Sequence, residues 1–160
     1  MRLSGRLGAL LGAVVLLAVA GFVGYQYYLA ALPHPGVTPG DPQVVALGKA
    51  LYGKHCASCH GVELQGQPNW QQRLANGRLP APPHDASGHS WHHPDKQLFT
   101  LTKFGPAALV GGGYESDMPG FMGTLSDEEI YAVLSYIKST WPREIQARHD
   151  EINRQSQSQQ

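Results

Sequence analysis

The segment Cys56-Ala57-Ser58-Cys59-His60 carries the strongest chemical signal in the chain, and it contains both cysteines of the 160 residues. The pattern C-x-x-C-H is typical of covalent c-type haem attachment. In a helical turn, positions i, i+3 and i+4 share one face. Cys56 and Cys59 can therefore form thioethers with the two haem vinyl groups while His60 offers a ring nitrogen to the iron. The segment predicts one covalently bound haem c.

Two other interpretations of the cysteines stay open. A C-x-x-C dithiol redox pair is typical of a βαβ context, and no such pattern is present. Alternatively, the cysteines form half of a zinc site that the segment 84–93 completes. The same segment could also suggest a second metal site of its own, formed by His84, Asp85, His89, His92 and His93. Pro94 breaks the helix that the last three would share, so we expect surface or capping roles for these histidines.

A second chemical feature lies in the loop that follows three consecutive glycines at 111–113. An iron held by one histidine has either a second ligand or an open site opposite. Methionine as the second ligand raises the reduction potential and makes an electron carrier. Met118 precedes Pro119, so its backbone is extended and its thioether can project from a loop. We expect Met118 to be the axial ligand, with Met122 as the alternative, and a histidine or an open site after both.

The long irregular segment 61–93 follows the haem motif and can wrap one haem edge. A ligating histidine normally donates its other ring N–H to a carbonyl or carboxylate. A backbone carbonyl within residues 80–83 is the predicted acceptor for His60. The segment also holds four residues whose N–H groups can reach the haem propionates: Trp70, Arg73, Arg78 and Trp91.

Two helices must position these groups. The first begins at Asp41-Pro42, with an aspartate N-cap and proline at the first helical position, and it runs up to the haem motif. The second begins at Ser126, and Glu129 three residues later completes a capping box. Both show apolar residues at helical spacing: Val44, Val45, Leu47, Leu51 and Tyr52 in the first, and Ile130, Val133, Leu134, Ile137 and Trp141 in the second.

The glycine at position 48 indicates where these two helices cross. A glycine inside a helix costs about 1 kcal/mol relative to alanine, which suggests a close crossing at this position. We expect Tyr136 to lie against Gly48 and Tyr52. A further helix is predicted over 94–104. The tail from Arg143 onward is expected to form a short helix to about Arg154 and then to fray, because its composition cannot bury a core.

The N-terminal region has the pattern of a membrane anchor. Residues 7–24 contain no charged side chain. This uncharged stretch is long enough for a transmembrane helix, and residues 29–32 could extend it. Arginines before this span keep the N-terminus cytoplasmic, and tyrosines after it would form an interfacial belt. A cleaved signal peptide is the alternative. Both interpretations place the rest of the chain across the membrane.

Composition and patterning divide the chain into four parts. They are the anchor or signal peptide at 1–32, a Pro- and Gly-rich linker at 33–41, the haem domain at 42–142 and a polar tail at 143–160. Twelve basic and twelve acidic residues give a formal net charge of zero. There is no basic field for nucleic acid, so no nucleic-acid partner is expected.

Residues 42–142 resemble a class I c-type cytochrome. The resemblance rests on the haem motif, on Met118-Pro119-Gly120-Phe121 as a Met-Pro-x-Phe axial segment, and on the pattern of the last helix from Leu125 to Ile137. It implies an all-α fold of three to five helices around one haem, with the first and last helices crossing at a glycine and an aromatic. It also implies one-electron transfer between membrane redox complexes.

These features predict a membrane-anchored electron carrier rather than an enzyme, although it could serve as a subunit of an oxidoreductase complex. The expected location is a bacterial inner membrane, with a single span and the haem domain in the periplasm. Redox proteins such as an oxidase or a dehydrogenase complex are the expected partners. Two alternatives remain: a haem enzyme or gas sensor with an open sixth site, and a periplasmic metal-handling cytochrome that uses the 84–93 segment.

Overall fold

The structure, a computed structural model, describes residues 15–24 and 36–158. The chain divides into two units, residues 1–34 and 35–160. In the first unit, residues 15–24 form a helix with exposed side chains. Neither this helix nor any helix within 36–158 is long and apolar enough to cross a membrane. The rest of the predicted anchor, residues 7–14 and 29–32, lies outside the described residues.

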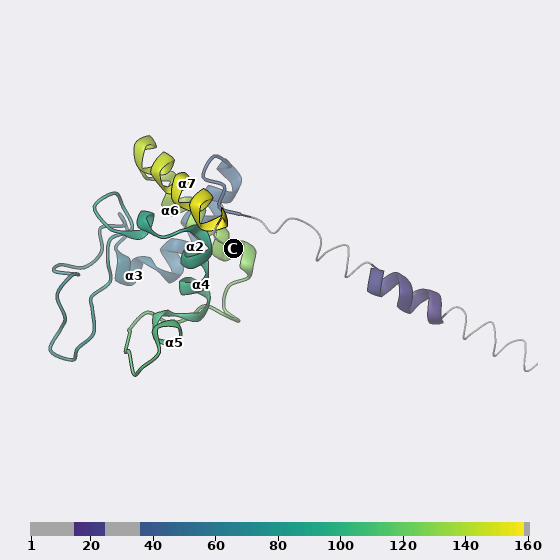
Figure 1. Cartoon of the computed structure of the whole chain (residues 1–160), viewed down its shortest axis with the longest axis horizontal. Coiled ribbons are helices and arrows are strands. Elements are labelled where there is room, and N and C mark those ends of the chain that lie inside the picture. Colours follow the sequence, from purple (N-terminus) through teal and green to yellow (C-terminus); the bar gives the residue numbers. More distant parts are fainter. Residues whose placement is uncertain (1–14, 25–35, 159–160) are drawn as a thin grey trace, which may run out of the picture. The chain divides into compact units, whose positions relative to one another are not determined.

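The second unit is all-α where the structure describes it, as predicted, and residues 36–158 contain no strand. Its helices in chain order are α2 (Pro42–His55), α3 (Ala57–His60), the 3₁₀ helix η1 (Ser90–His92), α4 (Asp95–Phe104), α5 (Pro106–Val110), α6 (Asp127–Ser139) and α7 (Arg143–Ser158). Helices α2, α4, α6 and α7 gather in one part of this unit, and the loops near α3 and α5 extend from it (Figure 1). These helices outnumber the expected three to five because the loops contain short ones.

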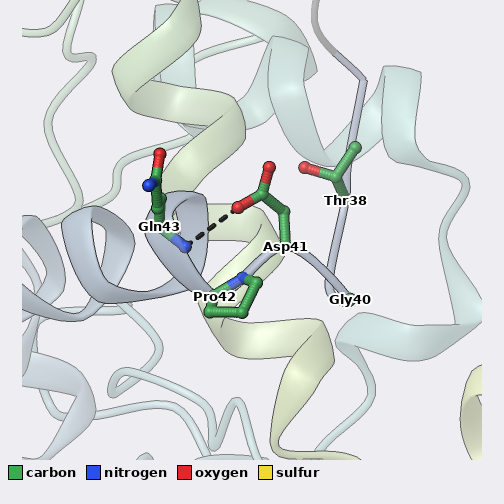
Figure 2. A pocket seen from close by; sticks show the side chains of 5 residues that line it. All are labelled: Thr38, Gly40, Asp41, Pro42 and Gln43. Atoms are coloured by element: carbon green, nitrogen blue, oxygen red, sulfur yellow. Dashed lines mark hydrogen bonds between the residues drawn. The ribbon is translucent and has the colours of Figure 1, made fainter.

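Side-chain caps start both helices that the sequence analysis singled out. At α2, the Asp41 carboxylate accepts hydrogen bonds from the backbone N–H groups of Gln43, at 2.9 Å, and Val44, at 3.3 Å. Figure 2 shows the first of these bonds at the start of the helix. At α6, Ser126 and Glu129 exchange hydrogen bonds of 3.2 and 2.8 Å. The predicted N-cap and capping box are both confirmed.

Helices α2 and α6 cross where Gly48 meets the backbone of Ala132. A Cβ atom on Gly48 would overlap the Ala132 carbonyl and would lie 2.9 Å from the Cβ of Tyr136. One turn later, the rings of Tyr52 and Tyr136 pack with centroids 5.5 Å apart. The predicted crossing of glycine and aromatic residues is therefore confirmed. It brings the end of α2, where the haem motif begins, against the buried face of α6.

Helix α7 continues to Ser158, four residues beyond the predicted fraying point at Arg154. His149 is 1% exposed, and its Nε2 lies 2.9 Å from the backbone oxygen of His93. Its ring also packs edge-on against Trp141 at 5.0 Å. The predicted helix is confirmed, but it ends four residues later than expected, because individual contacts such as that of His149 with His93 hold it in place.

Polar contacts tie α7 to two neighbouring helices. Asn153 accepts a 2.7 Å hydrogen bond from the backbone N–H of Asp95, one of the amides that the start of a helix leaves without an intrahelical partner. Asn153 also donates to the Asp95 carboxylate at 3.0 Å. Lys138 of α6, with a side chain 5% exposed, pairs with Asp150 at 2.5 Å. Because buried polar groups are costly without partners, these pairs specify how α7 docks.

Two glycines of α2 provide a matched test of the crossing. We expect Gly48→Ala to lower the free energy of unfolding by about 1–3 kcal/mol, because the overlap with Ala132 outweighs the helix propensity of alanine. Gly53 lies in the same helix with no atom within 4 Å of its Cβ position, so Gly53→Ala should stabilise by up to about 1 kcal/mol. Urea denaturation measures both. Equal changes in the free energy of unfolding for Gly48→Ala and Gly53→Ala would contradict the close contact of Gly48 with α6.

The docking of α7 should depend on pH through His149. Burial lowers the pKa of His149, and the nearby Asp95 opposes this shift. The pKa of a histidine in the unfolded chain is about 6.5. When the pKa in the folded protein is lower, the neutral histidine contributes fully to the stability of the fold above about pH 6.5. This contribution is lost as the pH falls towards the pKa of the folded state. We therefore expect the urea concentration at the midpoint of unfolding to fall when the pH is lowered from about 7.5 to about 5.5.

The variant His149→Phe separates this contribution from those of other groups. Burial raises the pKa of Asp95, which acts on stability in the opposite direction. Because Asp95 and His149 influence each other's pKa, the comparison of variant and wild type reports the contribution of His149 together with its effect on Asp95. The drop in midpoint over the same pH range should be smaller in His149→Phe. An unchanged drop would show that His149 does not titrate on unfolding.

Candidate functional site

One cavity of about 790 Å³ brings together the residues predicted to attach the haem and to bind its iron. Cys56, Cys59, His60 and Met118 all line it. Its volume lies within the range of roughly 300–1,000 Å³ that is common for cofactor sites. Met122, the alternative ligand, does not line the cavity and is 65% exposed.

The two cysteines and His60 belong to one helical turn. Cys56 ends α2 and precedes α3, and its carbonyl accepts the backbone N–H of His60 at 2.9 Å. Both thiols are free. Burial, together with the nearby Cys59, raises the pKa of Cys56 to about 11. A reactive dithiol needs a lowered pKa, so this environment disfavours the dithiol interpretation.

His60 is held in the tautomer that binds a metal through Nε2. Its Nδ1 lies 2.8 Å from the carbonyl oxygen of Pro82, to which it donates as a neutral imidazole. Burial lowers the pKa of His60, and the bond to Pro82 opposes that shift. The ring is therefore neutral at pH 7, with the lone pair of Nε2 available to iron. The predicted acceptor within residues 80–83 is confirmed as Pro82.

His84 lies beside His60 rather than on the surface. The two rings stack with centroids 4.0 Å apart and planes inclined by 22°, and His84 lines the cavity. Its Nδ1 is 2.8 Å from the hydroxyl of Ser90. Burial lowers the pKa of His84 far below its ordinary value, and the neighbouring His60 adds to this effect. The surface or capping role predicted for His84 was wrong, because the loop folds back onto the motif.

The other three histidines of the 84–93 segment take separate positions. His89 stacks on Trp70 at 5.1 Å, and both line the cavity. His92 is exposed and stacks on Trp91 at 3.7 Å. His93 offers its carbonyl to α7, as described above. Within residues 15–24 and 36–158, no three His, Cys, Asp or Glu side chains are grouped to hold a metal ion.

The residues predicted to reach the haem propionates also take different positions. Trp70 lines the cavity, whereas Trp91, Arg73 and Arg78 do not. Arg73 donates to the carbonyl of Gly77 at 2.6 Å. The Nε1 of Trp91 is buried without a hydrogen-bond partner in the protein.

Arg78 connects the two loops that flank the cavity. It pairs with Asp117, which precedes Met118, and with Glu115 at 3.2 Å. The backbone N–H of Met118 in turn donates to Ser116 at 3.1 Å. This bridge was not predicted from the sequence. The acidic residues beside Met118 were its only signal, and charge alone does not name a partner so far away in the sequence.

The residues around the cavity fit a covalently held haem. Two free thiols, an imidazole with an available Nε2 and a thioether line the same space. The Nδ1 of His89, which also lines the cavity, is buried and has no partner in the protein. Buried polar atoms are rarely left unpaired, so this nitrogen points to a ligand with polar groups of its own.

Comparison with known proteins identifies one family. Its sequence model, described as Cytochrome c, matches residues 45–141. The match covers more than half of the chain and includes the haem motif and Met118. No curated protein and no solved structure matches the chain significantly.

The two thiols can be tested one at a time. Cys56→Ala and Cys59→Ala should each leave one thioether, so that haem still migrates with the denatured polypeptide, at reduced yield. The double variant should release all haem on denaturation. Haem staining after denaturing electrophoresis and the intact mass measure these outcomes. Haem retained by the double variant would show that other groups attach it.

Proposed function

The chain belongs to the cytochrome c family, whose members carry covalent haem c and transfer electrons; on that premise we propose that His60 and Met118 are the two axial iron ligands of a one-electron carrier. The bound haem supplies the one-electron couple of its iron. A carrier needs both axial positions filled by the protein, because an open position invites substrates and gases. The choice of the second ligand therefore decides between carrier and enzyme.

The position of Met118 is the observation that carries this proposal. Met118 lines the same cavity as Cys56, Cys59 and His60, whereas Met122 is turned towards solvent. The residue after Met118 is a proline, which keeps its backbone extended. A methionine ligand raises the reduction potential, which suits a carrier that accepts electrons from membrane complexes.

The chain's own groups hold the two proposed ligands. His60 donates to Pro82 at 2.8 Å, which orients its ring and increases its basicity towards the metal. The segment around Met118 is tied through Asp117 to Arg78 of the opposite loop. The bond to Pro82 keeps the His60 ring in one orientation when the iron changes its oxidation state, and this favours fast electron exchange.

We further propose that this carrier works at the periplasmic face of a bacterial inner membrane. The uncharged stretch 7–24, preceded by Arg2 and Arg6, supports a single span with the haem domain outside. A formal net charge of zero gives little long-range steering to a partner. Tethering would compensate by raising the local concentration near an oxidase or dehydrogenase complex.

The two methionines give a direct test of the ligand. Met118→Ala should abolish the charge-transfer absorption band that a thioether ligand produces in the ferric protein, and carbon monoxide should then bind the ferrous protein rapidly. Met122→Ala is the matched control and should keep the band and resist carbon monoxide. Loss of the band only in Met122→Ala would reverse the assignment. Rapid binding of carbon monoxide to the wild type would favour the enzyme or sensor alternative.

Membrane attachment can be tested by fractionation. The wild-type chain should sediment with membranes and resist extraction by salt. A variant whose residues 1–32 are replaced by a cleavable signal peptide should yield a haem-loaded protein in the soluble periplasmic fraction. The intact mass of the wild type decides between anchor and signal peptide. Wild-type protein that is soluble and lacks the first 30 or so residues would overturn the anchor.

A further inference from the structure

The His60–Pro82 hydrogen bond alone leaves one motion of the His60 ring unrestrained. A single bond from Nδ1 to a carbonyl oxygen fixes one edge of the imidazole. The ring can still rock about the line that joins these two atoms, which lie 2.8 Å apart. Such rocking changes the plane in which the ligand meets the iron. A flat group against the ring face would remove this freedom.

His84 is such a group. Its ring centroid lies 4.0 Å from that of His60, with planes only 22° apart, so the two imidazoles are in face-to-face contact. The pair lies at the wall of the cavity, since both residues line it. Packing at this distance opposes any tilt of His60 towards His84, because protein interiors are close-packed and resist displacement.

The His84 ring is itself anchored at several points. Its Nδ1 is 2.8 Å from the hydroxyl of Ser90, which is 6% exposed. Its backbone N–H donates to the carbonyl of Leu64 at 2.8 Å. Its own carbonyl accepts the indole N–H of Trp141, also at 2.8 Å. The backbone and one edge of the ring are therefore fixed, and the ring of Tyr52 packs edge-on against His84 with centroids 6.3 Å apart.

We propose that His84 is a positioning residue for the iron ligand His60: it holds the plane of the ligand ring by stacking, while Pro82 holds its edge. This inference rests on the proposed ligation of iron by His60. It assigns a role to a histidine that neither the haem motif nor the family match explains. An aliphatic side chain would fill the same space, but it offers no flat face and no bond to Ser90.

The support extends to the C-terminal helix. Trp141, which donates to the carbonyl of His84, is 3% exposed and packs edge-on against His149 of α7 at 5.0 Å. A continuous series of contacts thus runs from His60 through His84 and Trp141 to α7. The family match ends at residue 141, so α7 lies outside the matched segment and contacts this side of the site.

The test uses the haem-loaded full-length protein and the spectrum of its ferric iron. Electron paramagnetic resonance g-values report the ligand field and the orientation of the axial ring, and the line widths report how variable that orientation is. His84→Leu should shift the g-values and broaden the lines, because the orientation of the His60 ring becomes more variable. His84→Phe restores a flat face and should return the spectrum towards the wild type. Ser90→Ala keeps the ring but removes its anchor, and it should produce a smaller change in the same direction.

The control and the outcomes keep this inference separate from the proposed function. His92→Leu changes an exposed histidine of the same loop that does not line the cavity, and it should leave the spectrum unchanged. A wild-type spectrum in His84→Leu would overturn the positioning role, as would equal shifts in His84→Leu and His84→Phe. If His84→Leu does not assemble with haem, a wild-type spectrum in Ser90→Ala would overturn the positioning role instead. A wild-type spectrum without methionine ligation would contradict the proposed function. The comparison of the His84 variants with the wild type would still test the positioning of His60.

Discussion

The close crossing of α2 and α6 at Gly48 is the constraint on which the rest of the site depends. Helix α2 leads directly into Cys56, which also precedes α3, so the angle of the crossing sets the direction of the whole haem motif. Tyr52 packs at the crossing and donates to the carbonyl of Gly61 at 2.9 Å. The motif is therefore tied to the helix pair both before Cys56 and just after His60, and a side chain at Gly48 would displace both ends.

The loops complete the site through backbone hydrogen bonds. The N–H of Gly66 donates to the carbonyl of His60 at 2.8 Å, and that of Gln67 donates to Ala81 at 2.9 Å. These bonds bring the segment before Pro82 back onto the motif, and the carbonyl of Pro82 then meets His60. A chain with this much loop has little apolar core of its own. A bound haem supplies the apolar contact that the helices alone do not provide.

The sequence predicted the features that arise from neighbouring residues or from the general chemistry of a ligand. The caps at Asp41 and Ser126 involve partners two or three residues away, and the need of His60 for an acceptor follows from how ligating histidines behave. The stacking of His84 was not predictable in the same way, because its partners are distant in sequence and meet only once the loop is folded. Helix α7 was underestimated for a related reason: composition measures average apolarity, whereas His149 and its neighbours act as individual pairs.

The proposed function depends on His60 and Met118 together closing the iron to other ligands. Near-infrared magnetic circular dichroism of the ferric wild-type protein tests this most directly, because the energy of its charge-transfer band differs between axial ligand pairs. We expect one low-spin species with the band of a histidine–methionine pair. A band typical of two nitrogen ligands, or a high-spin spectrum from an iron with an open or water-filled sixth position, would contradict it.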